Sequence, residues 1–264
     1  MKLTLSRRLF SNKKKKSNKD KDKSSLSDKE KGLVIGVGGA GAGIGLNVAS
    51  FNELQRDRNL IDKGENERLT KKLYEKAKAQ GTKVVEHPGL KDNAFYHPGR
   101  DTVFVGTQEG KLKQADVLSH ELGHSQYYRK GRSGKILGKI SHQASMPSRL
   151  LSQKRVAGVL AAANGYSLGR KVAENEGKQT KTDVARRLMP AALVAPVILS
   201  EAAASRRGLK MLKAAGASSA TMSKARRSLG GALGTYVGEG LVTTAIGEGS
   251  YHLGKHSVNK NKNN

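Results

Sequence analysis

The sequence predicts an α+β protein that is mainly α-helical, with a small N-terminal sheet and apolar helices of transmembrane length. Short segments rich in β-branched and aromatic residues, at 82–87 and 101–106, predict strands. Long segments rich in Ala, Gly and Leu, at 32–51 and over much of the chain after residue 131, predict helices. These helices have the composition of segments that pack closely together or enter a bilayer.

Composition limits the classes of protein that fit the chain. Its 264 residues suffice for one catalytic domain with appendages, and the absence of cysteine excludes disulfides and thiolate metal ligands. His, Asp and Glu are then the side chains that can hold a metal. The net charge of +27 favours an anionic partner. Because no nucleic-acid motif or aromatic interleaving accompanies the charge, nucleic-acid binding is not predicted.

Residues 1–31 form the first predicted unit, a disordered polybasic tail. They carry twelve Lys or Arg and four Asp or Glu, and too little apolar surface to fold. No apolar core follows Arg7 and Arg8, so the stretch is not a secretory signal. The tail is either simply solvated or attached to an anionic membrane surface, where each basic residue contributes on the order of 1 kcal/mol.

Residues 32–51 form a glycine-rich apolar helix without charge, long enough to cross a bilayer. The run from Gly36 to Gly41 fits the G-x-G-x-x-G pattern of dinucleotide-binding folds. The alternation of strands and helices that such folds require does not follow, so nucleotide binding is not expected. Small residues four apart, such as Gly32 and Gly36, would let another helix approach closely. The many glycines also lower helix propensity.

The next part of the chain, 52–257, is the predicted catalytic domain. Residues 52–80 are charged and helical in pattern, with Leu69, Leu73 and Ala77 on one face. A strand at 82–87, a loop at 88–99 and a strand at 101–106 follow. The second strand directly precedes a predicted helix that contains His120-Glu121-Leu122-Gly123-His124, an H-E-x-x-H motif. Zinc peptidases with this motif bind an extended substrate along such a strand.

His120, Glu121 and His124 form the H-E-x-x-H motif of zinc metallopeptidases. Residues four apart lie on one helix face, so the two imidazoles can bind one Zn²⁺ together. Glu121 is placed to polarise a metal-bound water. The motif predicts a zincin-like metallopeptidase core; the alternative is an ordinary helix with two surface histidines.

Three further apolar segments follow, at 156–169, 188–205 and 229–254, and a polar tail is expected at 258–264. Their Ala and Gly content leaves two alternatives open, membrane spans or a soluble helical bundle. Small residues recur at Gly230, Gly234 and Gly238. We therefore expect the last segment to pack closely against another helix, with the helix at 32–51 as the candidate.

A catalytic zinc needs a third protein ligand. The metzincin pattern fails, because Tyr127 and Lys130 stand where it requires Gly and His. Glu201 is the best candidate, since an ionised carboxylate in an apolar helix is costly unless it meets a metal or a partner. Ser205, one turn later, could contact a zinc-bound histidine. Alternatively, Glu201 only begins the polar stretch that follows. The weaker ligand candidates are His142, Asp183 and Glu239.

The order of motifs resembles the YugP-like neutral zinc metallopeptidases, which are membrane enzymes of the gluzincin type. The likeness rests on the segments 95–105, 120–126, 201–209 and 232–237, and spans roughly residues 68 to 245. It implies that His120, His124 and Glu201 hold Zn²⁺ and that Glu121 is the catalytic base. The basic tail and its following glycine-rich helix have no counterpart in that family, and the apolar segments between His124 and Glu201 are less hydrophobic here.

The predicted function is therefore a zinc-dependent endopeptidase associated with the membrane, in which metal-activated water attacks a peptide bond. Glu121 would take the proton from the water and pass it to the leaving amine. Three residues are open as a second electrophile: Tyr236, Tyr128 and Arg206. The alternative is a membrane- or virion-associated structural protein whose metal site is vestigial or structural. The expected partners are a protein or peptide substrate and an anionic membrane surface, and the sequence does not address the oligomeric state.

Overall fold

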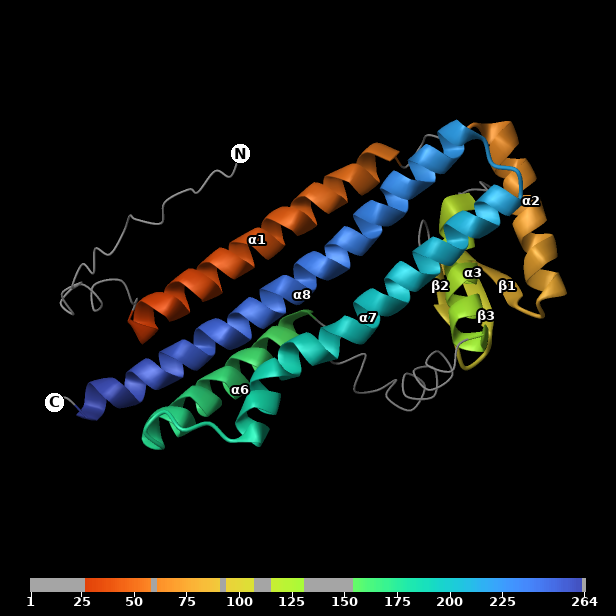
Figure 1. Cartoon of the computed structure of the whole chain (residues 1–264). Helices are drawn as coiled ribbons and strands as arrows, with labels where there is room; N and C mark the ends of the chain where they lie inside the picture. Colours follow the sequence, from red (N-terminus) through yellow and green to blue (C-terminus); the bar gives the residue numbers. More distant parts are fainter. Residues whose placement is uncertain (1–26, 58–60, 91–93, 107–114, 131–153, 263–264) are drawn as a thin grey trace, which may run out of the picture.

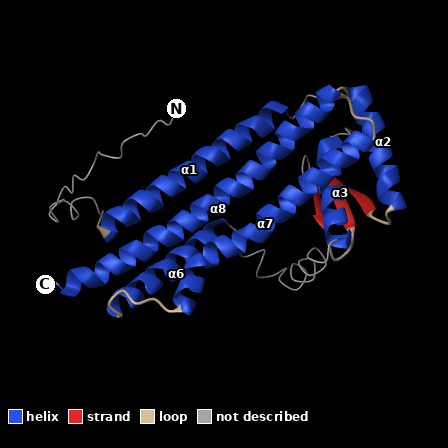
Figure 2. Cartoon of the chain, viewed as in Figure 1, coloured by secondary structure: helices blue, strands red, loops and turns tan. Residues whose placement is uncertain are grey.

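The computed structural model describes residues 27–57, 61–90, 94–106, 115–130 and 154–262. It is mainly helical, with one small sheet, as predicted. Long helices lie side by side and form an extended arm, and the sheet lies with two shorter helices at one end of it (Figures 1 and 2). The elements are α1 (Asp28–Asp57), α2 (Lys63–Ala79), β1 (Lys83–His87), η1 (Pro88–Leu90), β2 (Ala94–His97), β3 (Thr102–Gly106), α3 (Ala115–Lys130), α6 (Lys154–Glu174), α7 (Lys181–Ala214) and α8 (Ser219–Lys262).

The compact end of the molecule contains the main hydrophobic core. Helix α2 begins at the cap Asp62, whose carboxylate accepts a hydrogen bond from the Glu65 amide at 3.0 Å. Its apolar face buries Leu69, Leu73 and Ala77, as the periodicity predicted, against β3, α3 and the end of α7. Burial of each such leucine stabilises the fold by roughly 1.5–3 kcal/mol. This core fixes α3 between the sheet and α7.

The sheet has the order β1-β3-β2, so the strand that precedes the histidine helix is the central one. Lys83 pairs with Thr102 in the parallel β1–β3 ladder, and Ala94 pairs with Val105 in the antiparallel β2–β3 ladder. Both edges of β3 are therefore occupied, and it cannot bind an extended substrate as the sequence had suggested. The segment 94–97, predicted as part of a loop, is instead the edge strand β2.

Helices α1 and α8 pack against each other in opposite directions through small residues, as expected for the segment 229–254. A Cβ added at Gly43 would lie 2.6 Å from the Gly238 carbonyl oxygen, and one at Gly249 would lie 2.9 Å from the Cα of Gly36. Backbones this close admit no larger side chain. Gly41 and Gly45, in contrast, have nothing within 4 Å and face away from α8. The face of α1 that carries Gly41 and Gly45 therefore takes no part in the contact with α8.

Helix α6 also packs against α8 through close backbone contacts at glycines. A Cβ at Gly165, Gly169 or Gly254 would overlap a backbone oxygen across the α6–α8 contact. Helix α7 begins with a capping box, in which Thr180 and Asp183 satisfy each other's backbone amides. Its Pro190 lies against Gly247 of α8. The four long helices thus form one closely packed arm.

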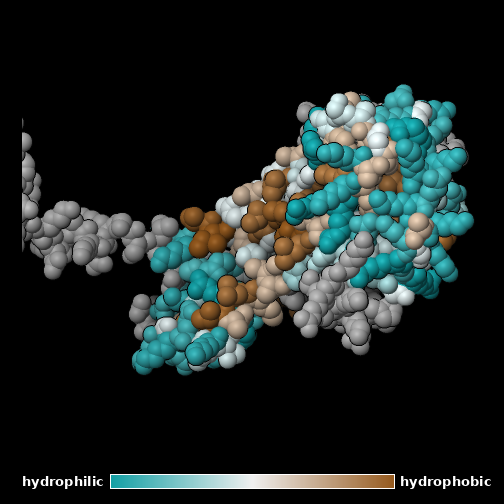
Figure 3. Space-filling view, turned by 45° about the vertical axis from the view of Figure 1, so that its right-hand side comes forward, coloured by the Kyte–Doolittle hydropathy of each residue, from teal (hydrophilic) through white to brown (hydrophobic). Residues whose placement is uncertain are grey.

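Two helices, α1 over Lys29–Ser50 and α7, are long and apolar enough to cross a membrane by length and composition. Side chains on the outer face of α1 are strongly exposed, with Leu33 and Val37 each at 64% and Ile44 at 55%. Hydrophobic residues gather along the arm, whereas the compact end is largely hydrophilic (Figure 3). The outward-facing apolar surface belongs to the arm.

Both predicted tails differ in the structure. Helix α1 already begins at Asp28, where Glu30 and Ser27 cap it through a 3.2 Å contact from the Glu30 amide to the Ser27 hydroxyl. The remainder of the predicted basic tail, 1–26, lies outside the described residues. At the other end, α8 continues to Lys262 and includes most of the expected polar tail at 258–264.

Candidate metal centre

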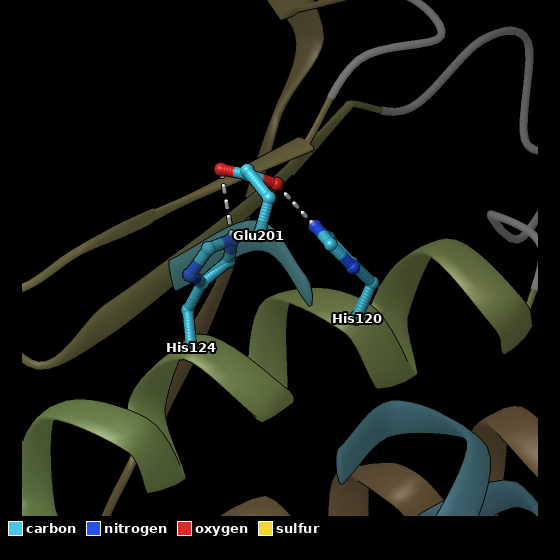
Figure 4. Close-up of side chains that lie close together, drawn as sticks. All are labelled: His120, His124 and Glu201. Carbon is cyan, nitrogen blue, oxygen red and sulfur yellow. Dashed lines mark hydrogen bonds and ion pairs between the residues drawn. The ribbon is translucent and has the colours of Figure 1, made fainter. Parts of the chain in front are cut away.

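Helix α3 presents His120 and His124 on one face, one turn apart, as the motif predicted. Their ring centroids are 4.8 Å apart and nearly perpendicular, at 87°. Both residues are buried at the junction of α3 with α7. Both Nε2 atoms point toward the same carboxylate (Figure 4). The local helix geometry therefore converges two imidazole nitrogens on one position.

Glu201 of α7 supplies that carboxylate, although it lies 81 residues from His120 in the sequence. One of its oxygens is 3.1 Å from His120 Nε2 and the other is 3.4 Å from His124 Nε2. Donors in a tetrahedral zinc site are about 3.4 Å apart, since each metal–ligand bond is roughly 2.0–2.2 Å. The three donor atoms all lie within 4.8 Å of one another. The set therefore fits a small divalent metal such as Zn²⁺.

The close approach of α7 to α3 depends on two glycines. A Cβ at Gly123, inside the motif, would overlap the backbone carbonyl of Ala204, and one at Gly208 would lie 2.9 Å from the Ser119 carbonyl oxygen. Ala204 itself is fully buried in the contact. Glu201, one turn before Ala204, is thereby brought to the two histidines. The sequence showed Gly123 only as an unspecified position of the motif.

Ser205 contacts the far nitrogen of the first histidine, as the sequence suggested. Its Oγ lies 3.2 Å from His120 Nδ1. When Nε2 of a histidine binds a metal, Nδ1 carries the proton and donates it to a neighbouring acceptor. With His120 in that tautomer, the Ser205 hydroxyl accepts this hydrogen bond. The pair therefore orients the imidazole for coordination through Nε2, the nitrogen that faces Glu201.

A polar cluster around Asp101 holds the sheet to α3, and the sequence analysis did not identify it. Its carboxylate accepts hydrogen bonds from Tyr96 at 2.9 Å and from Ser125 at 3.1 Å, and it pairs with Arg129. Asp101 has a positive φ of 45°, which Asp tolerates better than most residues. The cluster fixes β2 and β3 beside α3. The sequence signal for this cluster was limited to Asp101, a carboxylate directly before strand β3.

Tyr236 and Tyr128 lie near the three candidate ligands. Burial and the charges of Glu201 and Glu121 raise the pKa of the Tyr236 phenol, so it stays protonated at neutral pH. Tyr128 stacks on His124 with centroids 6.4 Å apart, and burial likewise raises its pKa. Arg206, the third candidate electrophile, instead lines a groove between α7 and α8. Two of the three candidates therefore lie within electrostatic range of the site.

Glu121 is buried on α3, between the two histidines in sequence, with an exposed fraction of 8%. Its charge acts on the Tyr236 phenol, as does that of Glu201. The charges of the catalytic-base candidate and of the metal-ligand candidate therefore both raise the pKa of the same tyrosine.

Two of the weaker ligand candidates, Asp183 and Glu239, do not join the histidines. Asp183 caps α7 and pairs with Lys171 at 2.7 Å, which accounts for its burial. Glu239 lies on α8, where its charge acts on Tyr236, but it is outside the group of converging donors. His142 lies outside the described residues. Among the residues described, only the predicted set His120, His124 and Glu201 has metal-binding geometry.

Comparison with protein families, with curated proteins and with solved structures finds no match to the chain.

Proposed function

We propose that the protein is a zinc-dependent endopeptidase associated with the membrane. The observation that carries the proposal is the contact of one Glu201 carboxylate with the Nε2 atoms of both motif histidines, at 3.1 and 3.4 Å. The likeness of its motifs to the YugP-like neutral zinc metallopeptidases supports the same assignment. Three protein donors are typical of catalytic zinc sites, whereas structural sites use four.

Bound zinc would lower the pKa of a coordinated water toward about 7 and polarise the scissile carbonyl. Glu121 accepts the proton of the attacking water and returns it to the leaving amine. Tyr236 keeps its proton because burial and three nearby carboxylates raise its pKa, so its hydroxyl can donate a hydrogen bond to the developing oxyanion. We assign this role to Tyr236 in preference to Tyr128. The charges of both Glu121 and Glu201 raise the pKa of Tyr236, whereas of these two charges only that of Glu201 raises the pKa of Tyr128.

An extended peptide could bind along the outer edge of strand β2. Its Tyr96 ring stacks on Tyr128 at 5.8 Å, and Tyr128 stacks on His124, so three rings connect β2 to the metal ligands. β2 pairs with β3 alone within the described sheet, and an unpaired strand edge can add a further strand through main-chain hydrogen bonds. A peptide added there would pass close to His124. This arrangement favours unstructured protein segments as substrates.

Membrane association is supported by the arm. Helix α1 carries strongly exposed apolar residues, and Ser50, at the end of its apolar stretch, packs against Gly234 of α8. On the other side of α8, Gly240 packs against Ile198 of α7. Gly240 is less than two helical turns from Gly234, and Glu201 lies one turn after Ile198 on α7. The metal-ligand candidates thus lie level with the end of the apolar surface. We propose that the active site faces substrates close to the bilayer.

The alternative function is that of a membrane structural protein whose metal only joins α3 to α7. It is favoured by one observation, that the candidate ligands connect two helices whose backbones already touch. Chelation separates the two functions. The endopeptidase proposal expects cleavage of an unfolded casein substrate that a chelator abolishes and added zinc restores, with little loss of helical content. A chelator that melts α3 and α7, in a protein that cleaves nothing when zinc is bound, would support the structural role instead.

A further inference from the structure

A groove of about 400 Å³ lies between the end of α7 and the start of α8. Apolar side chains form part of its wall: Leu209, Met222 and Leu229. Four exposed cations also line it: Arg206, Lys210 and Lys213 from α7, and Arg226 from α8. The α7 cations lie four and three residues apart, which places them on one helix face. The groove combines an apolar wall with a positively charged one.

No acidic residue lines this groove, and none of its four cations forms an ion pair with any residue that the structure describes. Like charges held this close repel one another, so an anion that enters the groove is bound favourably. Each of the segments 1–26, 58–60, 91–93, 107–114 and 131–153 is neutral or positive in net charge. An anion from outside the chain therefore complements the groove better than any of these segments does.

The position of the groove indicates what that occupant is. The apolar stretch of α1 ends at Ser50, which packs against Gly234. The groove residues of α8 directly precede Gly234 and end at Leu233. On α7, the uncharged stretch ends before Glu201, and the cations begin at Arg206. The cations therefore stand just past the end of both apolar stretches, at the level where lipid phosphates lie when a bilayer surrounds such stretches.

We propose that this groove binds the headgroup of an anionic phospholipid. The arginine side chains hold the phosphate, the two lysines contribute charge at the rim, and the first carbons of an acyl chain cover the leucines. The proposal rests on the membrane association proposed above, and it does not depend on catalysis. An acidic peptide would complement the charge of the groove equally well. It would not explain why the groove lies at the end of the apolar arm, where lipid phosphates are expected.

The test uses the full chain in a non-ionic detergent, titrated by calorimetry with three probes: dihexanoyl phosphatidylglycerol, dihexanoyl phosphatidylcholine and inorganic phosphate. The variant Lys210→Gln/Lys213→Gln removes two groove cations. Its matched control, Lys71→Gln/Lys78→Gln, removes two exposed lysines of α2. We expect phosphatidylglycerol to bind at least tenfold more tightly than either other probe. The groove variant should bind it about 10- to 30-fold more weakly, and the α2 variant should bind it as the parent does.

Three outcomes would overturn the proposal. Equal binding of phosphatidylcholine would show that charge does not select the ligand, and equal binding of inorganic phosphate would show that no lipid is needed. Displacement of phosphatidylglycerol by an equimolar acidic peptide would assign the groove to a protein partner. Because the titration is made in detergent and does not measure cleavage, its failure is separate from that of the peptidase assay or of membrane fractionation.

Discussion

The backbone of Gly123 lies directly against the backbone of Ala204, so that a Cβ at position 123 would overlap the Ala204 carbonyl group. This contact between the middle of the H-E-x-x-H motif and Ala204 of α7 sets the separation of α3 and α7. The separation in turn decides whether Glu201 reaches both histidines. The glycine in the motif therefore has a positional role of its own.

Gly123→Ala should push α7 away from α3. Overpacking of this kind costs about 1–3 kcal/mol of the free energy of unfolding, and zinc affinity should fall with it. Gly230→Ala is the matched control, because nothing lies within 4 Å of a Cβ at that helical position; it should be neutral or stabilising by up to ~1 kcal/mol. Thermal unfolding and zinc content check both variants. Unchanged zinc binding in Gly123→Ala would show that the approach of the helices is not needed.

Glu201→Gln should lower zinc affinity more than the roughly 10- to 100-fold loss typical of removing a hydrogen-bond partner of a ligand. The amide keeps the shape of the side chain but removes the charge that faces both histidines. His142→Ala, at the alternative histidine, should keep the full zinc content. Metal analysis after dialysis against a weak chelator measures both. Loss of zinc in His142→Ala with retention in Glu201→Gln would reverse the assignment.

Tyr236→Phe should lower kcat by about 10²- to 10³-fold, the usual loss for an oxyanion donor, with KM and zinc content little changed. The raised pKa of Tyr236 means that the parent loses no activity through this group as the pH rises through neutrality. Tyr128→Phe, which keeps the ring stacked on His124, should have the smaller effect on kcat. If Tyr128→Phe shows the larger loss in kcat, the two roles must be exchanged.

Membrane association can be tested with two substitutions on the exposed face of α1. In a bilayer, Val37→Lys and Ile44→Lys would each cost about 2.5–3.5 kcal/mol, whereas exposed positions in water tolerate such changes within ±0.5 kcal/mol. The parent should stay in the membrane pellet after a high-salt or alkaline wash, and the double variant should be depleted from it. Release of the parent by salt alone would mean that only electrostatic attraction holds the protein to the membrane.

The sequence predicted those features that depend on local pattern. Two histidines four residues apart share a helix face wherever that helix lies, and the small residues of α1 and α8 indicated a close helix contact that the structure confirms. Glu201 could be singled out because a carboxylate is costly in an apolar helix. Its position beside His120 matches that reasoning. The contact of Ser205 with His120 was likewise predictable from one helical turn.

Features that depend on long-range packing were not predictable. β2 has only four residues, too few for a periodic pattern, and it is a strand only because β3 pairs with it. The Asp101 cluster unites groups from three separate segments. The lysine- and asparagine-rich end of α8 has the composition of a solvated tail, yet it continues a 44-residue helix. In each case the tertiary context decides.

Cleavage of unfolded casein by the zinc-loaded parent and by zinc-loaded Glu121→Gln tests the central claim most directly. The amide is nearly isosteric with the carboxylate but cannot accept a proton, so zinc content should stay the same in both proteins. The rate should fall by roughly 10²- to 10⁴-fold in the variant, the usual contribution of a general base. Equal rates in the two proteins, at equal zinc content, would contradict the assignment of this site as a peptidase active site.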